Sequence, residues 1–341
     1  MTMLSGKRNE EIDILRGFAA ICMILGHSIL RYPIDLTCIP WCSVLEHWIF
    51  TFHMELFFLI AGICYRCFDY KGFIKKKFNR IMVPYLFFGI LSLFLKAFGG
   101  SAVNRSESIG SGVTKLFFYG GNYWFLYVIF LIFLIYPFVE KVVNTDLRKT
   151  MLVVVLLVVP FFVEIPELIK LNSFVYYLPF FIVGQVCVGM FRNNELDISS
   201  GLKRNKMRGY YLLVICIIVY LVLDKTENTH ALCNLFRFLR SMAILVAMFI
   251  CVYVLDNQLD NRKEWIQLKR IICKCGQFSL QLYLFNGYIL TVTRIILCNV
   301  LNIDNPLVLV TSIWIINIAI TLLLCDYIIP KVRVLKTLCG L

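Results

Sequence analysis

The first long apolar segment of the chain carries an ionisable side chain at each end. Residues 16–27 read RGFAAICMILGH, with no charge between Arg16 and His27. A charged side chain at the centre of a bilayer costs roughly 2.5–3.5 kcal/mol on insertion scales, so such groups indicate function. On a helix of about 3.6 residues per turn the two side chains share one face, about 16 Å apart along the axis. Asp13, three residues before Arg16, can pair with it.

The next apolar segment, WIFTFHMELFFLIAG (48–62), adds two more ionisable groups. His53 is expected at a depth within about one turn of His27, with Glu55 slightly deeper. His53 and Glu55 are about 200° apart on a helix, so only one of them can face His27 directly. Intramembrane histidines and carboxylates are candidates for chemistry or for a proton relay. The alternative is that they only hydrogen-bond neighbouring helices.

The stretch that follows, YRCFDYKGFIKKKFNRIMVPY (65–85), is the most basic in the chain. Lysine and arginine bind phosphates as point charges and as bidentate forks, so Lys76, Lys77 and Arg80 could hold a nucleotide-bearing substrate. The alternative is that these charges only set membrane topology. Arg80 is the strongest candidate for binding because it opens the next apolar segment beside Pro84.

These groups must be positioned by membrane helices. Of the 341 residues 60% are hydrophobic and 16% charged, and the mean hydropathy is +0.79. The apolar residues gather in blocks of about the length that spans the hydrocarbon core. We therefore expect an all-α polytopic membrane protein of about ten transmembrane helices, folded as a single domain over residues 1–341. The blocks are 14–32, 44–65, 81–98, 122–140, 151–164, 174–191, 210–223, 235–255, 278–300 and 307–329.

The distribution of positive charge predicts the orientation. Of 34 Lys and Arg residues, 24 fall in one set of alternate loops with both termini, 5 in the opposite loops, and 5 in or at the ends of the blocks. Cytoplasmic loops carry the excess of positive charge, so both termini are expected in the cytoplasm. The same rule explains the net charge of +13 without nucleic acid as a partner. No cleavable signal peptide is expected, because the first apolar run lacks a small-residue cleavage site.

The cysteines and histidines do not predict a metal site. Cys273 and Cys275 are too close together and too isolated for a structural zinc ion, which takes four ligands. Most other cysteines lie singly inside apolar blocks, where they act as small hydrophobic residues. We therefore expect no metal cofactor.

Several stretches, in order, resemble the multispan membrane acyltransferases that O-acetylate bacterial surface polysaccharides and related glycans. IDILRGFAAICMILGH is similar to that family's Asp-x-x-Arg-Gly opening and its motif of Arg, ten residues and His. FHMELFFLIAGICY resembles its acidic-Leu-Phe-Phe segment, and FIKKKFNRIMVPYL its basic run ending in Pro-Tyr. NYWFLYVIFL and SLQLYLFNGY are similar to later segments. The matching positions are Asp13, Arg16, Gly17, His27, His53, Met54, Glu55, Phe57, Phe58, Gly62, Arg80, Pro84, Tyr85 and Trp124.

The resemblance implies an acyl-CoA donor, usually acetyl-CoA, and a hydroxyl of a surface polysaccharide or lipid-linked glycan as acceptor. It also implies a bacterial cytoplasmic membrane as the location. A neutral imidazole at His27 would take the hydroxyl proton, with His53 or Glu55 orienting it. Transfer through an acyl-histidine is the alternative. The expected donor-binding residues are Asp13, Arg16, Lys76, Lys77 and Arg80, and Tyr123, Trp124 and Asn286 are expected to line the substrate channel.

The sequence departs from the family pattern at two positions. Ala61 stands where the family usually has Ser, and Asn286 where many members have His. Two other functions remain open from the residues: a proton-coupled transporter or exporter that uses His27, His53 and Glu55 as a relay, and an inactive partner subunit of a polysaccharide synthase. Against the transporter, the chain lacks an internal repeat and paired Gly/Pro-broken segments.

Overall fold

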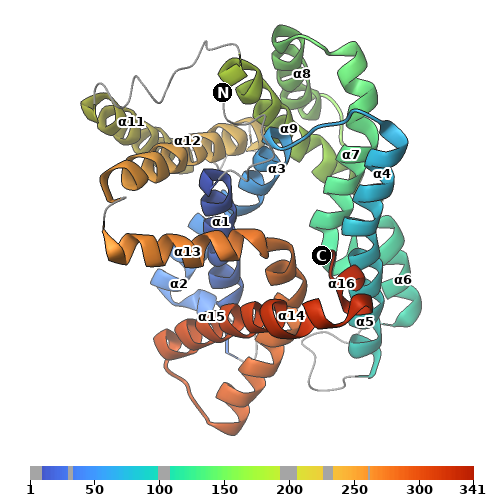
Figure 1. The fold of residues 1–341 in the computed structure, drawn as a ribbon, viewed down its shortest axis with the longest axis vertical. Helices are drawn as coiled ribbons and strands as arrows, with labels where there is room; N and C mark the ends of the chain where they lie inside the picture. Colours follow the sequence, from blue (N-terminus) through green and yellow to red (C-terminus); the bar gives the residue numbers. More distant parts are fainter. Residues whose placement is uncertain (1–9, 30–33, 99–107, 193–205, 226–232, 260–261) are drawn as a thin grey trace.

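The computed structural model describes residues 10–29, 34–98, 108–192, 206–225, 233–259 and 262–341, which are helical with no strand in these ranges (Figure 1). The first half contains α1 (Glu10–Ser28), α2 (Pro40–Phe50), α3 (His53–Ile63), α4 (Tyr70–Lys77), α5 (Val83–Phe98), α6 (Ile109–Phe118), α7 (Trp124–Val142) and α8 (Asp146–Val158). The second half contains α9 (Leu171–Arg192), α11 (Lys206–Lys225), α12 (Cys233–Leu259), α13 (Lys263–Gln277), α14 (Ser279–Arg294), α15 (Pro306–Leu323) and α16 (Arg333–Leu338).

Seven helical stretches within the described residues are long and apolar enough to cross a membrane. Their bounds are Pro40–Ile63, Tyr70–Ala97, Ile109–Val142, Leu168–Val188, Asn234–Asp256, Ser279–Val300 and Pro306–Lys331. The described residues of the other three expected blocks are mostly helical. They fall in α1, which holds four charged side chains in its first two turns, in α8 with 13 residues, and in the shorter apolar stretch Tyr211–Asp224 of α11. The all-helical membrane architecture is confirmed, while the count of ten spans and the orientation stay predictions.

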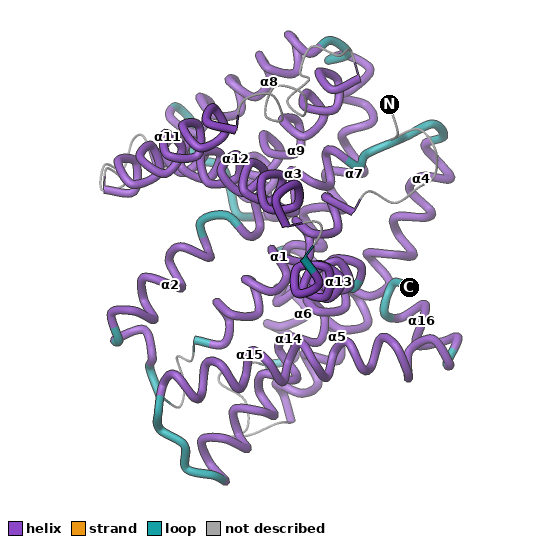
Figure 2. Tube along the Cα trace, turned by 60° about the vertical axis from the view of Figure 1, so that its left-hand side comes forward, coloured by secondary structure: helices purple, strands orange, loops and turns teal. Residues whose placement is uncertain are grey.

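Helix α1 runs through the middle of the molecule. It contacts α2, α3, α12, α13, α14 and α15, and Figures 1 and 2 both show α13 beside it. Its buried positions, which include Leu15, Ala20 and Ile24, lie all round the helix rather than on one stripe. The indole N–H of Trp314 in α15 also donates to the carbonyl of Ile21 at 3.1 Å. A helix that carries Asp13 and Arg16 is therefore surrounded by protein rather than by lipid.

Two glycines let α1 and α13 approach backbone to backbone. A Cβ on Gly17 would collide with the carbonyl of Ile272 and reach the amide N of Gly276 at 3.0 Å. Reciprocally, a Cβ on Gly276 would collide with the carbonyl of Asp13. Membrane helices use small residues in this way to gain close van der Waals contact. This crossing sets the position of the first turns of α1, which carry Asp13 and Arg16.

A second glycine crossing joins α3 to α9. A Cβ on Gly62 would collide with the carbonyl of Phe181, and one on Gly184 with the carbonyl of Leu59. The side chain of Gln185 donates a hydrogen bond to the carbonyl of Gly62 at the same place. Helix α3, which carries His53 and Glu55, is therefore held tightly against α9.

The glycine crossings generate a stability prediction. Gly17→Ala should destabilise the protein by about 1–3 kcal/mol, because the added methyl group overpacks a backbone contact. Gly287→Ala is the control, since a Cβ there meets nothing within 4 Å and alanine favours a helix over glycine by about 0.5–1 kcal/mol. Thermal unfolding of the detergent-purified variants measures both. Equal midpoints for Gly17→Ala and Gly287→Ala would contradict the assigned packing.

Candidate functional site

His27 and His53 both contact the ring of Phe50. The Phe50 centroid is 5.3 Å from the His27 ring and 5.0 Å from the His53 ring, edge to face in both cases. His53 is buried, whereas His27 is exposed at the end of α1. The structure thus brings the two predicted imidazoles, from α1 and α3, against one aromatic ring of α2. We call His27, Phe50 and His53 the imidazole cluster.

A break in the second apolar segment creates this arrangement. Helix α2 ends at Phe50, Thr51 and Phe52 form a turn, and α3 begins at His53. The sequence predicted one continuous helix over 44–65, so this break was missed. The Thr51 hydroxyl donates to the carbonyl of His47 at 2.8 Å, and its own carbonyl accepts from the Ser241 hydroxyl at 2.7 Å. These bonds satisfy backbone carbonyl groups at the break, where the regular hydrogen bonds of a helix are interrupted.

The hydrogen bond of His53 assigns its tautomer. Its Nδ1 lies 2.9 Å from the carbonyl oxygen of Ile49. A carbonyl oxygen only accepts, so Nδ1 carries the proton and Nε2 of the neutral ring is left as an acceptor. His53 can therefore receive a hydrogen bond or a proton at Nε2 while its ring is held in place.

Four predicted donor-binding side chains gather elsewhere, around the end of α3. The guanidinium of Arg16 donates to the Sγ atom of Cys64 at 3.2 Å. The ammonium of Lys77 interacts electrostatically with Arg16, Lys76 and Arg80. We call Arg16, Lys76, Lys77 and Arg80 the cationic cluster. A group of like charges in one place favours an anionic ligand.

Aromatic rings and an irregular turn position this cluster. The Lys77 ammonium lies 3.9 Å from the Phe133 ring centroid and 5.3 Å from that of Phe73, in cation–π geometry. Arg80 lies on a π-helical turn, Phe78–Met82, in which the N–H of Val83 donates to the carbonyl of Phe78. Single π turns inside helices are frequent at functional sites.

The carbonyl of Arg80 receives no helical hydrogen bond from Pro84 and is covered by the C-terminal turn. Proline has no N–H to donate to the carbonyl four residues before it, which here belongs to Arg80. Gly340, with φ of +72°, packs against that carbonyl, and a Cβ there would lie 2.6 Å from it. Gln281 anchors the same turn by donating to the carbonyl of Cys339 at 2.7 Å. The last residues of the chain therefore lie beside the cationic cluster.

Asp13 is buried and turned toward α13. Burial, followed by the negative charges of Asp13 and Glu10, raises the pKa of the Cys273 thiol, which places the Asp13 carboxylate near that side chain. The pairing of Asp13 with Arg16 stays a prediction.

Glu55 points into a different network, on the α9–α12 side of α3. Its Oε1 accepts a hydrogen bond from the Tyr176 hydroxyl at 3.2 Å, and its Oε2 is buried with no hydrogen-bond partner among the described residues. The Arg237 guanidinium lies 4.7 Å from the Tyr176 ring centroid and, like that of Arg240, interacts with the Glu55 charge. Because the two residues are about 200° apart on the helix, their side chains leave it on opposite sides. His53 therefore belongs to the imidazole cluster, while Glu55 meets α9 and α12.

Sequence reasoning missed Tyr176 and the two arginines as parts of the site. Arg237 and Arg240 are three residues apart in the apolar stretch CNLFRFLRSMAILV, so they share a helix face. That spacing was the available signal. Arg240 is buried and pairs with Asp224 at 2.9 Å, and Asp224 in turn lies 2.8 Å from Nε2 of His47. His47 thereby connects α2 to α11 and α12.

The three predicted channel residues are held by protein contacts. Tyr123 is buried and donates to the carbonyl of Leu284 at 3.1 Å. Trp124 stacks on Tyr177, with centroids 5.4 Å apart. The amide of Asn286 accepts from Asn317 of α15 at 2.9 Å. Their part in a substrate channel stays a prediction.

The described residues contain no group of three or more His, Cys, Asp or Glu side chains that could hold a metal ion.

A family model described as an acyltransferase domain, acyltransferase family 3, matches residues 9–329. The match includes the imidazole cluster, the cationic cluster and the Glu55 network. No match was found among curated proteins or among solved structures. The matched region covers nearly the whole chain, so the protein belongs to acyltransferase family 3 and is an integral membrane protein of the acyltransferase kind.

Proposed function

We propose that this protein transfers an acyl group, most simply acetyl, from acyl-CoA to a hydroxyl of a surface polysaccharide or lipid-linked glycan in the bacterial cytoplasmic membrane. The observation that carries the proposal is the presence of two different chemistries at the two ends of one protein-enclosed helix. Arg16 near the start of α1 belongs to the cationic cluster, and His27 near its end belongs to the imidazole cluster. Membership of an acyltransferase family supports assigning a donor and an acceptor to them.

The cationic cluster suits the phosphates of CoA. Arginine binds phosphate oxygens through paired N–H groups and lysine through a point charge, so Arg16, Lys77 and Arg80 offer both modes. The count of loop charges predicts that this cluster faces the cytoplasm, where acyl-CoA is made. Arg16 and His27 are separated by about 16 Å along α1, a distance that the extended pantetheine arm of CoA can cover. Asp13 would stabilise the first turns of α1 from the α13 side.

The imidazole cluster suits the transfer step. The acceptor hydroxyl oxygen attacks the thioester carbonyl carbon while a ring nitrogen of His27 takes the hydroxyl proton, which makes the weak nucleophile reactive. The carbon–sulfur bond then breaks, and the CoA thiolate leaves and takes up the proton from His27. His53, whose Nε2 is left as an acceptor by the bond to Ile49, can share that proton through a bridging hydroxyl or water. Glu55 lies on the other side of α3, where Tyr176 and Arg237 hold its carboxylate.

His27→Ala should lower acyl transfer by a factor of about 10²–10⁴, the typical contribution of a general base. Membranes that contain the protein are incubated with labelled acetyl-CoA and with surface glycan taken from cells that lack the protein. The label transferred to the glycan is then measured. His47→Ala is the matched control because His47 bonds Asp224 instead of lying in the imidazole cluster.

Two results would contradict this assignment. His27→Ala with more than about a tenth of the wild-type rate would exclude a base at that position. Glycan that crosses vesicle membranes without any need for acyl-CoA would favour a transporter instead. Label left on the denatured wild-type protein, and absent from His27→Ala, would indicate the acyl-histidine route.

Lys77→Gln and Arg80→Gln should each raise the KM for acetyl-CoA about tenfold, because a charge-assisted hydrogen bond to phosphate is lost. The increase should be smaller with the donor that lacks the 3′-phosphate if the altered residue contacts that group. Lys71→Gln is the control, since Lys71 is exposed on the same helix, α4, and lies outside the cationic cluster. An unchanged KM in both cluster variants, measured at low salt, would contradict donor binding at this place.

A further inference from the structure

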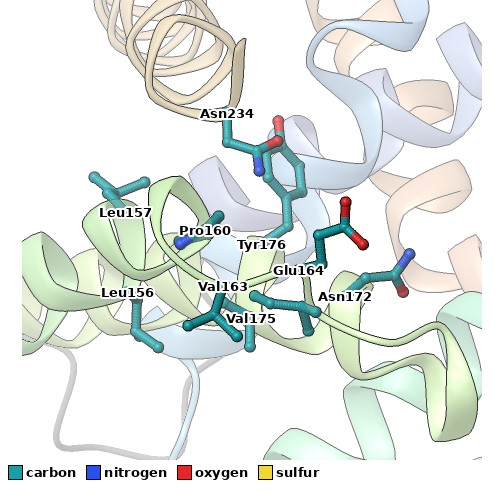
Figure 3. Close-up of a pocket in the computed structure, with 10 residues that line it drawn as sticks. Leu156, Leu157, Pro160, Val163, Glu164, Asn172, Val175, Tyr176 and Asn234 are labelled. Atoms are coloured by element: carbon teal, nitrogen blue, oxygen red, sulfur yellow. The ribbon is translucent and has the colours of Figure 1, made fainter. Parts of the chain in front are cut away.

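A cavity of about 170 Å³ lies at the junction of α8, α9 and α12, outside both clusters (Figure 3). Leu156 and Val175 contribute to its apolar wall, and Glu164, Asn172, Tyr176 and Asn234 bring polar groups to it. An apolar cavity of about 150 Å³ is known to accept a benzene ring. The volume therefore fits one six-membered ring rather than a chain of several.

The polar groups of the cavity have unused hydrogen-bonding capacity. Among the described residues, no hydrogen bond or ion pair involves the Glu164 carboxylate or the Asn234 side chain. Asn172 uses its Oδ1 to accept from the N–H of Ser173 at 2.6 Å and from its hydroxyl at 3.3 Å, so its NH₂ group remains available. Figure 3 shows the side chains of Glu164 and Asn172 on the same side of the view, while the Tyr176 ring extends toward Asn234.

This chemistry selects a neutral, polyhydroxylated ring. A carboxylate accepts hydrogen bonds from hydroxyl groups, and an amide both donates and accepts. A purely apolar ligand would remove water from these groups without replacing its hydrogen bonds, which is unfavourable. An anionic ligand would be repelled by Glu164. The hydroxyl edge of a sugar suits the polar side, and its C–H face suits Leu156 and Val175.

The segment that carries Glu164 and Asn172 has a defined shape. Ile169 and Lys170 have φ of 58° and 54°, a left-handed conformation that is unusual for a β-branched residue such as isoleucine. The N–H of Asn172 donates to the carbonyl of Pro166 at 3.3 Å, and that of Lys170 to the carbonyl of Glu167 at 2.8 Å. Strained backbone of this kind persists where surrounding structure holds it, often at ligand sites. The segment is thus organised before any ligand binds.

One side chain links the cavity to the buried carboxylate of Glu55. The Tyr176 ring lines the cavity, and its hydroxyl donates to Oε1 of Glu55. The other carboxylate oxygen of Glu55, Oε2, is buried and has no hydrogen-bond partner in the part of the chain that the structure describes. The loop-charge count predicts that residues 164–172 and the start of α12 lie on the side opposite the cationic cluster. That is the side from which an acceptor would arrive while the donor enters from the cytoplasm.

We infer that this cavity is an acceptor subsite that binds one neutral sugar ring of the glycan, away from the hydroxyl that is acylated. The inference rests on the proposed glycan acyltransferase function and adds a binding place for a part of the acceptor that does not react. Glu164 and Asn234 bond ring hydroxyls, and Tyr176 contacts the ring and separates it from Glu55.

Binding is tested first without turnover. The full-length protein in detergent is heated with glucose, galactose or N-acetylglucosamine, and with the anionic sugar glucuronate. At least one neutral sugar should raise the unfolding midpoint of the wild type and of Glu167→Gln, because a ligand that binds only the folded state stabilises it. Glu164→Gln and the cavity-filling Val175→Phe should lose this shift. Glu167 is the matched control, since it lies in the same segment but does not line the cavity.

Kinetics then separate the subsite from the reaction centre. With intact surface glycan as acceptor, Glu164→Gln and Asn234→Ala should raise KM about tenfold and leave kcat nearly unchanged. The monosaccharides obtained from the same glycan occupy only the position of the reacting sugar. With these acceptors the two substitutions should have little effect. Unchanged KM for glycan, with no stabilisation by any neutral sugar, would overturn the subsite while acyl transfer itself persists. Stabilisation that depends on Glu164 in a protein that acylates no glycan would support the sugar site and overturn the proposed function.

Discussion

The central physical constraint in this protein is the enclosure of α1, a helix with a charged first half, by other helices. Asp13 and Arg16 would be costly against lipid, but α1 is in contact with six other helices and its buried residues lie on all sides. Close packing around it depends on Gly17 and Gly276, where no side chain keeps the two backbones apart. Each of the two clusters contains one side chain of this central helix, Arg16 near its start and His27 near its end.

Interruptions in the surrounding helices present most of these groups. The break at Thr51 and Phe52 allows Phe50 and His53 to meet His27, although α2 and α3 are parts of one apolar segment. The π turn before Pro84 carries Arg80 next to Lys77. Irregular backbone is tolerated at membrane depth only where protein or water satisfies it. Here the hydroxyls of Thr51 and Ser241 donate hydrogen bonds to backbone carbonyls at the break.

The Glu55 network gives α3 a second role. The same helix supplies His53 to one side and Glu55 to the other, where Tyr176 and Arg237 hold the carboxylate. The glycine crossing of α3 with α9 at Gly62 and Gly184 keeps Tyr176 in register with Glu55. A single rigid helix therefore connects the imidazole cluster to the cavity on the α9–α12 side. Substrate groups bound at these two places would be positioned relative to each other by α3.

The sequence alone determined that this is a helical membrane protein, and it predicted ionisable groups within the apolar segments. Both conclusions come from local patterns. The length of the hydropathy blocks matches the thickness of a bilayer, and the helical period places Arg16 and His27 on one face. The motif order likewise indicated the acyltransferase family that the comparison then confirmed. Only the tertiary structure decided which groups meet: that Lys77 joins Arg16 around Cys64, that His53 contacts the same ring as His27, and that Glu55 pairs with Tyr176. Helix breaks, π turns and contacts between distant helices arise from long-range packing, and no spacing within one segment encodes them.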